Sequence, residues 1–324
     1  MSLAVSVVVP TYKRPHLLHN CLDSLIRQQF PREAYEIIVV DDADAQETRS
    51  LVELFSGQVR TCPEIRYAAA TETQGPAAAR NIGWRMARGE IIAFTDDDCL
   101  PEPDWLKEGL AAFHEGMVGV SGQVIVPVPS PPTDYEKNVS RLTDCIFVTA
   151  NCFYRRSVLE AEGGFDEQFT TAWREDSDLQ FKMLTLSYPL GVAPAARVVH
   201  PVRPGGWGVS IKEQRKSMFD ALLFKKYPEL YRRLVQSGPP WRYYGIVLAT
   251  LVFFAAILAG NKLLALLMVV IWTLLVLHFS SLRLKDTKHT PAHVLEMLFT
   301  SAVIPYLSVF WRLYGAFYFR VWFF

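Results

Sequence analysis

A strand-like run that leads directly into three acidic residues is the feature of this sequence that most restricts its fold. Residues Ile91–Thr95 are apolar or β-branched, and Asp96, Asp97 and Asp98 follow at once. Such a run predicts a buried strand of an α/β sheet, where ligands bind at the carboxyl ends of strands. Two like charges about 4 Å apart repel by about 4 kcal/mol at an effective dielectric constant of 20, so three adjacent carboxylates favour a shared proton or a bound cation. We therefore predict a site for Mg²⁺ or Mn²⁺ together with a diphosphate; the alternative is an acidic turn that faces water.

Composition limits the class of protein. The chain has 324 residues, enough for one large domain or two modest domains. Its 33 lysines and arginines balance 33 aspartates and glutamates, so no overall field predicts a nucleic-acid partner. The five cysteines form no Cys-x-x-Cys pair, which indicates reduced, partly buried thiols. The first five residues lack the charged and apolar regions of a secretory signal, so we expect a domain that faces the cytosol.

From Ala4 to about Gly122, strand-like runs alternate with runs of helical periodicity. Alternation of this kind predicts a parallel sheet with helices on both faces. The expected strands are Ala4–Val9, Tyr35–Val40, Ile65–Ala69 and Ile91–Thr95, and the expected helices lie around 17–26, 51–55, 76–86 and 105–113.

The following segment continues this pattern less regularly. We expect strands at Val118–Val126 and Phe147–Tyr154, a short last strand that ends at His200, and a helix at Glu175–Thr185. Four prolines between residues 127 and 132 predict an exposed, mobile connection. The run Ser210–Lys226 predicts an amphipathic helix with several basic residues, suited to anionic lipid headgroups.

The sequence becomes strongly apolar after Arg242. Tyr243–Gly260 and Leu263–Leu282 carry no charge, and each approaches the length of about 20 residues that crosses a bilayer. Asn261-Lys262 separates them, so we predict a membrane hairpin; the alternative is a pair of buried core helices. Val294–Phe319 is apolar but contains polar residues and a proline, and it could cross the membrane or lie in the interface, which we slightly favour. Basic residues lie at both outer ends of the hairpin and predict that both ends are cytoplasmic: Arg232, Arg233, Arg242, Arg283, Lys285 and Lys288.

Six motifs in this order and spacing resemble those of family-2 glycosyltransferases of the GT-A fold, over about residues 3–200. The motifs are Val5–Arg14, Glu36–Asp42, Ala79–Gly83, the acidic triplet with Pro101, Gly163–Asp166 and Arg174–Leu179. The resemblance implies a Rossmann-like mixed sheet with helices on both faces. It implies a metal-dependent, inverting transfer of a sugar from a nucleotide-diphosphate donor, a UDP sugar in our reading. With the apolar segments, this predicts a catalytic domain at 1–209, a connector at 210–241 and a membrane domain at 242–324.

The resemblance also assigns residues to the donor. Asp42 would accept a hydrogen bond from the base, and the alternative for the Asp41-Asp42 pair is a helix N-cap. Arg80 would neutralise the diphosphate with a forked contact, although a surface ion pair is the plainer reading. The full set of implied donor-binding residues is Pro10, Thr11, Tyr12, Arg14, Asp42, Arg80, Asn81, Asp96 and Asp97.

The same motifs imply which residues bind the metal ion and which residue is the catalytic base. Asp98 would ligate the metal, with His200 as a second ligand or, equally, as a structural histidine. Asp176 would be the base that takes the proton of the acceptor hydroxyl, with Glu175 and Asp178 as alternatives. Acids at this position would also suit the start of a helix.

The acceptor is less well specified. Trp173 could stack on an acceptor sugar or pack in the core, and Trp207 lies in a glycine-rich loop that we expect to close over the donor. A lipid- or polyprenyl-linked acceptor at the cytoplasmic membrane face suits the apolar segments. No Gln-x-x-Arg-Trp motif of processive members is present, so we do not expect a polymer-extruding synthase. The other classes considered are a non-catalytic membrane scaffold and a nucleotidyltransferase.

Overall fold

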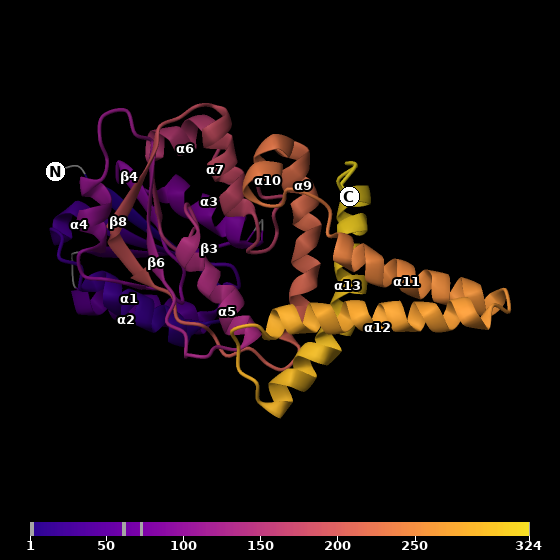
Figure 1. Cartoon of the computed structure of the whole chain (residues 1–324). Helices are drawn as coiled ribbons and strands as arrows, with labels where there is room; N and C mark the ends of the chain where they lie inside the picture. The colour runs from indigo at the N-terminus through magenta and orange to yellow at the C-terminus, as the bar shows by residue number, and fades with distance from the viewer. Residues whose placement is uncertain (1–2, 60–62, 72–73, 324) are drawn as a thin grey trace. The chain divides into compact units, whose positions relative to one another are not determined.

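The computed structural model describes residues 3–59, 63–71 and 74–323, and it divides into two compact units (Figure 1). The first unit holds Met1–Pro127 and Ser140–Val202, and the second holds Val128–Val139 and Arg203–Phe324. The proline-rich connection therefore belongs largely with the carboxyl-terminal part of the chain. Arg283 explains this placement, because its Nη2 donates to Asp134 Oδ2 at 2.7 Å within the second unit.

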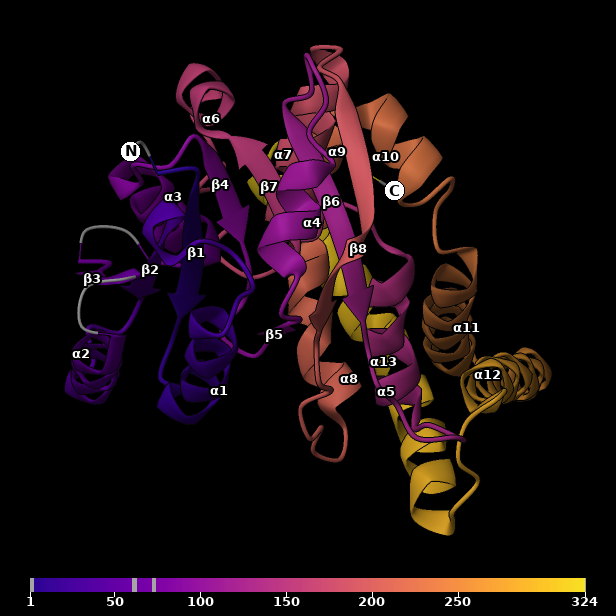
Figure 2. The ribbon, with the colours of Figure 1, turned by 90° about the vertical axis from the view of Figure 1, so that its left-hand side faces the viewer.

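The first unit is built on one eight-stranded mixed sheet, in the order β3-β2-β1-β4-β7-β6-β8-β5 (Figure 2). β1 pairs in parallel with β2 and with β4, and β2 pairs in parallel with β3, as the alternating pattern predicts. β7 pairs antiparallel with β4 and β6, and β5 pairs antiparallel with β8. The strands are β1 (Val5–Thr11), β2 (Tyr35–Asp41), β3 (Glu64–Ala69), β4 (Ile91–Phe94), β5 (Leu100–Pro101), β6 (Gly119–Ile125), β7 (Cys152–Arg155) and β8 (Leu190–Val199).

Helices cover both faces of this sheet. One face packs on the apolar sides of α3 (Pro76–Met86), α6 (Arg156–Glu162) and α7 (Glu175–Thr185), around Phe94 and Tyr154. The other face is covered by α1 (Pro15–Ile26), α2 (Gln46–Val59) and α4 (Trp105–Ala111). The central strands β1, β2 and β4 are fully buried, which is why they read as continuous apolar runs.

Several predicted boundaries were wrong. The short helix expected at 51–55 is the 14-residue α2, because its exposed polar residues hide the periodicity at both ends. Only the end of the strand expected at Phe147–Tyr154 is β7, since Phe147 adopts a positive φ of 59° that a strand does not contain. The last strand is not short: β8 runs for ten residues, with a bulge opposite Gly122/Gln123 that interrupts its burial pattern.

The second unit is helical. It contains α5 (Asp134–Ser140), whose last residue lies in the first unit, and α10 (Pro228–Leu234). The expected helix Ser210–Lys226 is instead three consecutive pieces: α8 (Val209–Lys212), the 3₁₀ helix η3 (Glu213–Ser217) and α9 (Met218–Lys226). Leu222 and Leu223 of its expected apolar side are buried.

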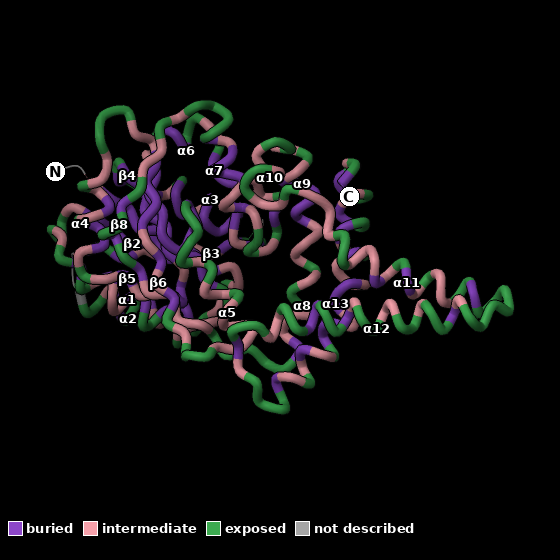
Figure 3. The backbone as a smooth tube through the Cα atoms, in the orientation of Figure 1, coloured by how far each residue is buried: buried purple, intermediate pink, exposed green. Residues whose placement is uncertain are grey.

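Three long apolar helices end the chain: α11 (Trp241–Leu258), α12 (Lys262–Leu284) and α13 (Pro291–Tyr318). Each is long and apolar enough to cross a membrane. Much of the α11–α12 hairpin is exposed (Figure 3). Its exposed large apolar side chains include Leu251, Leu258 and Leu266. Large apolar side chains in such numbers suit a lipid environment.

Tyr306 joins the three helices through hydrogen bonds. Its hydroxyl lies 2.6 Å from Thr250 Oγ1 of α11, and it accepts a hydrogen bond of 2.8 Å from Trp272 Nε1 of α12. Polar groups inside an apolar helix bundle are costly unless they bond to one another. This triad therefore specifies how α11, α12 and α13 pack.

Candidate active site

The site begins where the central parallel strands end. β1 ends at Thr11, which is in register with Asp41 at the end of β2, and the acidic triplet follows β4 on the other side of β1. Because neighbouring parallel strands end at the same sheet edge, the fold brings the predicted acidic residues together.

Asp97 is fully buried and held by the turn that follows β1. Its Oδ2 accepts a 2.6 Å hydrogen bond from Thr11 Oγ1, and its Oδ1 pairs with Arg14 Nη2 at 2.9 Å. Burial raises the pKa of the Asp97 carboxyl to about 6, against the opposing charge of Arg14. Thr11, Arg14 and Asp97 were all predicted to bind the donor, and the first two thus contact Asp97 directly.

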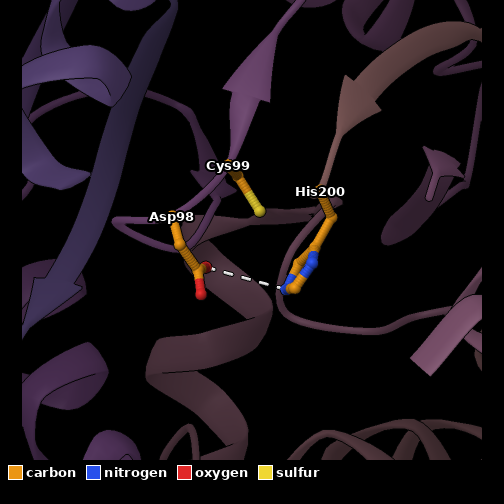
Figure 4. A group of neighbouring side chains, drawn as sticks. All are labelled: Asp98, Cys99 and His200. Atoms are coloured by element: carbon orange, nitrogen blue, oxygen red, sulfur yellow. Dashed lines mark ion pairs between the residues drawn. The ribbon is translucent and has the colours of Figure 1, made fainter. Parts of the chain in front are cut away.

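Asp98 and His200 form the candidate metal site (Figure 4). His200 follows β8, and its Nε2 lies 3.6 Å from Asp98 Oδ1. Both side chains are largely buried, and a carboxylate with an imidazole is a donor pair that suits Mn²⁺. The residues present therefore fit a divalent ion.

Cys99 completes this group, although no sequence pattern predicted a role for it. One ligand atom from each of Asp98, Cys99 and His200 lies within 4.8 Å of the others. Burial raises the pKa of the Cys99 thiol well above its ordinary value, and thiols bind metals as thiolates. Asp98 and His200 are thus the better ligands. In the sequence, the position of Cys99 directly after the acidic triplet was the signal that could have predicted its place in this group.

Arg80 links the triplet to the Glu175-Asp176 motif. Its Nη2 donates to Asp96 Oδ1 at 2.7 Å, and its Nη1 donates to Glu175 Oε1 at 3.0 Å. Burial alone would raise the pKa of Asp96, but Arg80 with His200 and Arg14 holds it below its ordinary value. The plainer prediction of a surface ion pair for Arg80 is wrong, because its side chain is only 3% exposed.

We expect Arg80→Gln to destabilise the protein by about 3–5 kcal/mol, because it leaves the carboxylates of Glu175 and Asp96 without their shared cation. Thermal unfolding of the full chain in detergent measures the effect. The matched control is Arg85→Gln on the same helix, whose side chain is half exposed and should change little. An Arg80→Gln protein as stable as wild type would contradict this account.

Glu175 and Asp176 differ in environment. Glu175 is buried against Arg80, and burial raises the pKa of its carboxyl to about 7. Asp176 is half-buried, and its Oδ1 accepts hydrogen bonds from the backbone and hydroxyl of Ser177. Arg174, just before them, has a φ of 76°, a strained conformation for a residue other than glycine. Of the two acids, Asp176 is the more accessible.

The paired aspartates after β2 have separate partners. Asp41 is buried and accepts hydrogen bonds from the backbone N–H groups of Ala43 and Ala45, both of which precede α2, so it holds the turn before that helix and is not its N-cap. Both carboxylate oxygens of Asp42 accept from the N–H of Gly75, whose φ is 108°. Burial raises the pKa of Asp42 despite this bond.

Asn81 holds a turn. Its Nδ2 donates to the Phe165 carbonyl at 2.9 Å, and its Oδ1 accepts from Trp84 Nε1 at 2.8 Å. A Cβ on Gly164, which has a φ of 70°, would lie 2.4 Å from that Trp84 nitrogen, so close packing requires glycine at position 164. These structural contacts are enough to explain an asparagine at this position. A role for Asn81 in binding the sugar donor stays a prediction.

The other predicted residues lie apart from these contacts. Pro10 is buried in β1, and Tyr12 is half exposed in the turn after it. Trp173 is 36% exposed, and the Arg174 guanidinium lies 4.5 Å from its ring centroid. Trp207 belongs to the second unit, where its ring packs 5.3 Å from that of Phe299. Acceptor binding by either tryptophan stays a prediction.

Several known proteins are similar to this chain in sequence. The family model described as "Glycosyl transferase family 2" matches residues 6–178, more than half of the chain. The chain is 28% identical over 214 residues to the glycosyltransferase AglE of Haloferax volcanii, covering 62% of this chain and 68% of AglE. It is 32% identical over 110 residues to the poly(ribitol-phosphate) β-N-acetylglucosaminyltransferase TarS of Staphylococcus aureus, but these cover only 34% of this chain and 19% of TarS.

Solved structures share the fold. The mannosyltransferase PcManGT from Pyrobaculum calidifontis, in complex with GDP-Man and Mn²⁺, aligns with a TM-score of 0.60 and 23% identity, over 96% of this chain and 88% of that chain. TarS 1–349 from S. aureus, in complex with UDP, aligns with a TM-score of 0.51 and 18% identity, over 94% and 90%. Since the family model spans most of the sheet and both acidic motifs, the chain belongs to glycosyl transferase family 2.

Proposed function

We propose that this family-2 enzyme is an inverting, metal-dependent glycosyltransferase. It takes a sugar from a nucleotide-diphosphate donor, a UDP sugar, and transfers it to a lipid-linked acceptor at the cytoplasmic face of the membrane. The observation that carries this proposal is the double ion pair of Arg80, which connects Asp96 of the triplet to Glu175 beside the proposed base. The Arg80 guanidinium would thereby link the residues proposed to bind the donor to those proposed to act on the acceptor.

The donor would bind at the sheet edge formed by β1, β2 and β4. Thr11, Arg14 and Asp97 already form a connected group there, and Asp42 lies after the neighbouring strand. Arg14 offers a partly exposed guanidinium, and guanidinium groups favour phosphate oxygens because they can form two hydrogen bonds at once. The diphosphate would therefore lie over Arg14 and the triplet.

Asp98 and His200 would hold Mg²⁺ or Mn²⁺, which when bound acts as a Lewis acid toward the diphosphate of the leaving nucleotide. Asp97 and Asp96 would then stay paired with Arg14 and Arg80, although Arg14 also lies 3.7 Å from Asp98 and Arg80 is shared with Glu175. This arrangement limits the repulsion within the triplet that the sequence analysis identified.

Asp176 would accept the proton of the acceptor hydroxyl as that oxygen attacks the anomeric carbon. The new bond forms on the face opposite the leaving group, and the electron pair of the broken bond stays with the nucleotide diphosphate. Glu175 would not compete for this role, because it is buried and its Oε1 is held by Arg80. A positioned base of this kind contributes typically 10²–10⁴-fold.

The membrane side of the proposal depends on the three apolar helices. Arg242 lies at the start of α11 and Arg283 near the end of α12, so both outer ends of the hairpin carry positive charge. This supports a cytoplasmic first unit and a multi-pass anchor. An enzyme kept at the membrane meets a lipid-linked acceptor at a raised effective concentration. α13 buries Arg312 and packs against η3 and α9, which supports an interfacial position for it.

The full chain in detergent tests this function. It is incubated with a series of nucleotide sugars that includes UDP sugars and GDP-mannose, with membrane-lipid extract as acceptor and mass spectrometry as readout. We expect a glycosylated lipid from a UDP sugar with Mn²⁺ or Mg²⁺, and loss of product with EDTA that added Mn²⁺ reverses. Metal-dependent donor binding without product from any acceptor would instead indicate a scaffold, and transfer of the nucleotidyl group would indicate a nucleotidyltransferase.

A further inference from the structure

A cavity of about 530 Å³ lies in the second unit, and its lining residues are not those of the candidate active site. It is formed by the first turn of α11, the residues just before it, the start of α9 and the carboxyl-terminal half of α13. α13 packs against both α9 and α11 (Figure 1). The volume falls within the range of small-molecule sites, which is about 300–1,000 Å³.

Positive charge predominates in the lining. Arg242 and Arg312 line the cavity together with one carboxylate, that of Asp220. Hydroxyl and amide side chains, including Ser217, Ser308 and Gln236, supply the remaining polar groups. One excess positive charge with hydroxyl donors is a combination that favours a phosphate group.

Arg312 is the least satisfied of these groups. It is only 4% exposed, and its Nη1 donates to Gln236 Oε1 at 3.2 Å. Among the described residues, its Nε and Nη2 find no hydrogen-bond partner. The guanidinium carbon lies 3.6 Å from the ring centroid of Phe323, a contact that stabilises the charge but satisfies no N–H group. A buried guanidinium with this shortfall favours an anion in the adjoining cavity.

The position of the cavity indicates where such an anion would come from. Trp241, which opens α11 and lines the cavity, is 72% exposed, and α11 continues from it as an uncharged helix after Arg242. Tryptophan and arginine at the end of an apolar helix are typical of the headgroup level of a membrane. An anion at this depth belongs to a lipid more readily than to a soluble metabolite.

We infer that this cavity binds the phosphate group of an anionic membrane lipid, with Arg312 and Arg242 as its cationic contacts. The inference rests on the membrane placement in the proposed function and adds a lipid-binding site to it. A phosphorylated acceptor lipid belongs to the class of ligand that the cavity would take.

Binding is measured with the full chain in nonionic detergent, by native mass spectrometry and thermal shift. The probes are dioleoyl phosphatidic acid, dioleoylglycerol, which has the same chains without phosphate, and inorganic phosphate. We expect phosphatidic acid to be retained and to raise the Tm, with no comparable effect of dioleoylglycerol. Arg312→Gln should weaken this binding about ten-fold or more. Arg233→Gln, an exposed arginine of the same unit outside the cavity lining, is the matched control and should bind as wild type.

Arg242→Gln keeps the test decisive if Arg312→Gln does not fold, because Arg242 is exposed and its replacement should weaken binding as well. Unchanged binding in the variants that fold, or equal binding of dioleoylglycerol, would overturn the inference. An equal response to inorganic phosphate would replace the lipid by a free anion and overturn it too. Mn²⁺-dependent nucleotide binding, measured in the same preparations, tests the proposed function separately, since it should survive both substitutions.

Discussion

Asp176→Asn should lower kcat by about 10²- to 10⁴-fold while leaving the Tm of the protein near that of wild type. The asparagine keeps an Oδ1 that can accept the hydrogen bonds from Ser177, so the start of α7 should remain intact. It cannot take a proton from an acceptor hydroxyl. Single-turnover transfer to the lipid acceptor, together with thermal unfolding, measures both halves of the prediction.

Glu160→Gln is a suitable control, because it neutralises an exposed carboxylate of the first unit that pairs with Arg156 four residues earlier. Its kcat should match that of the wild type. If Asp176→Asn turns over at the wild-type rate, Asp176 is not the base, and Glu175 is the next carboxylate to replace.

Asp98→Ala should lower the affinity for Mn²⁺ by at least about 100-fold and remove metal-dependent donor binding. Loss of a supporting contact around a metal ligand typically costs 10- to 100-fold in affinity, so loss of a ligand should cost at least as much. Mn²⁺ binding is measured by electron paramagnetic resonance and donor binding by calorimetry. Stability should not fall in step, because the substitution also removes one charge from the repelling triplet.

The control for Asp98→Ala is Asp23→Ala, which removes a partly exposed carboxylate that pairs with Arg27 on the surface of α1. Its Mn²⁺ affinity should equal that of the wild type. Undiminished Mn²⁺ binding by Asp98→Ala would separate the metal site from the acidic triplet and leave His200 without its proposed role.

Local sequence patterns were enough to predict the central part of the fold. The bounds of α3 and α7 agree with the predicted helices, because both begin with strong signals: a proline at the first turn of α3 and three acids in the first turn of α7. β1, β2 and β4 were predicted because strands buried on both faces are continuously apolar. β8 was misjudged as a short strand, since its partial exposure and its bulge break such patterns, and β7 begins later than predicted because Phe147 adopts a positive φ.

The candidate site was likewise predicted only in part from the sequence. Its acids were identified from the sequence because three carboxylates after a buried strand are rare without a cation. The partners of those acids were not identified, because they are far away in the sequence. Arg80 and Glu175 are 95 residues apart, and Thr11 and Asp97 are 86 residues apart. The different burial of Glu175 and Asp176, adjacent in the chain, also depends on what packs around the start of α7.

The sequence by itself determined which segments are buried strands, which helices can enter a membrane, and which residue types gather at the strand ends, since these depend on the local order of apolar and charged residues. Tertiary structure alone decided which cation neutralises which carboxylate, and it placed Arg312 beside a cavity with two of its nitrogens unpartnered in the part of the chain that the structure describes. Charges act through space, so their effect is known only when the chain has folded and their distances and burial are known.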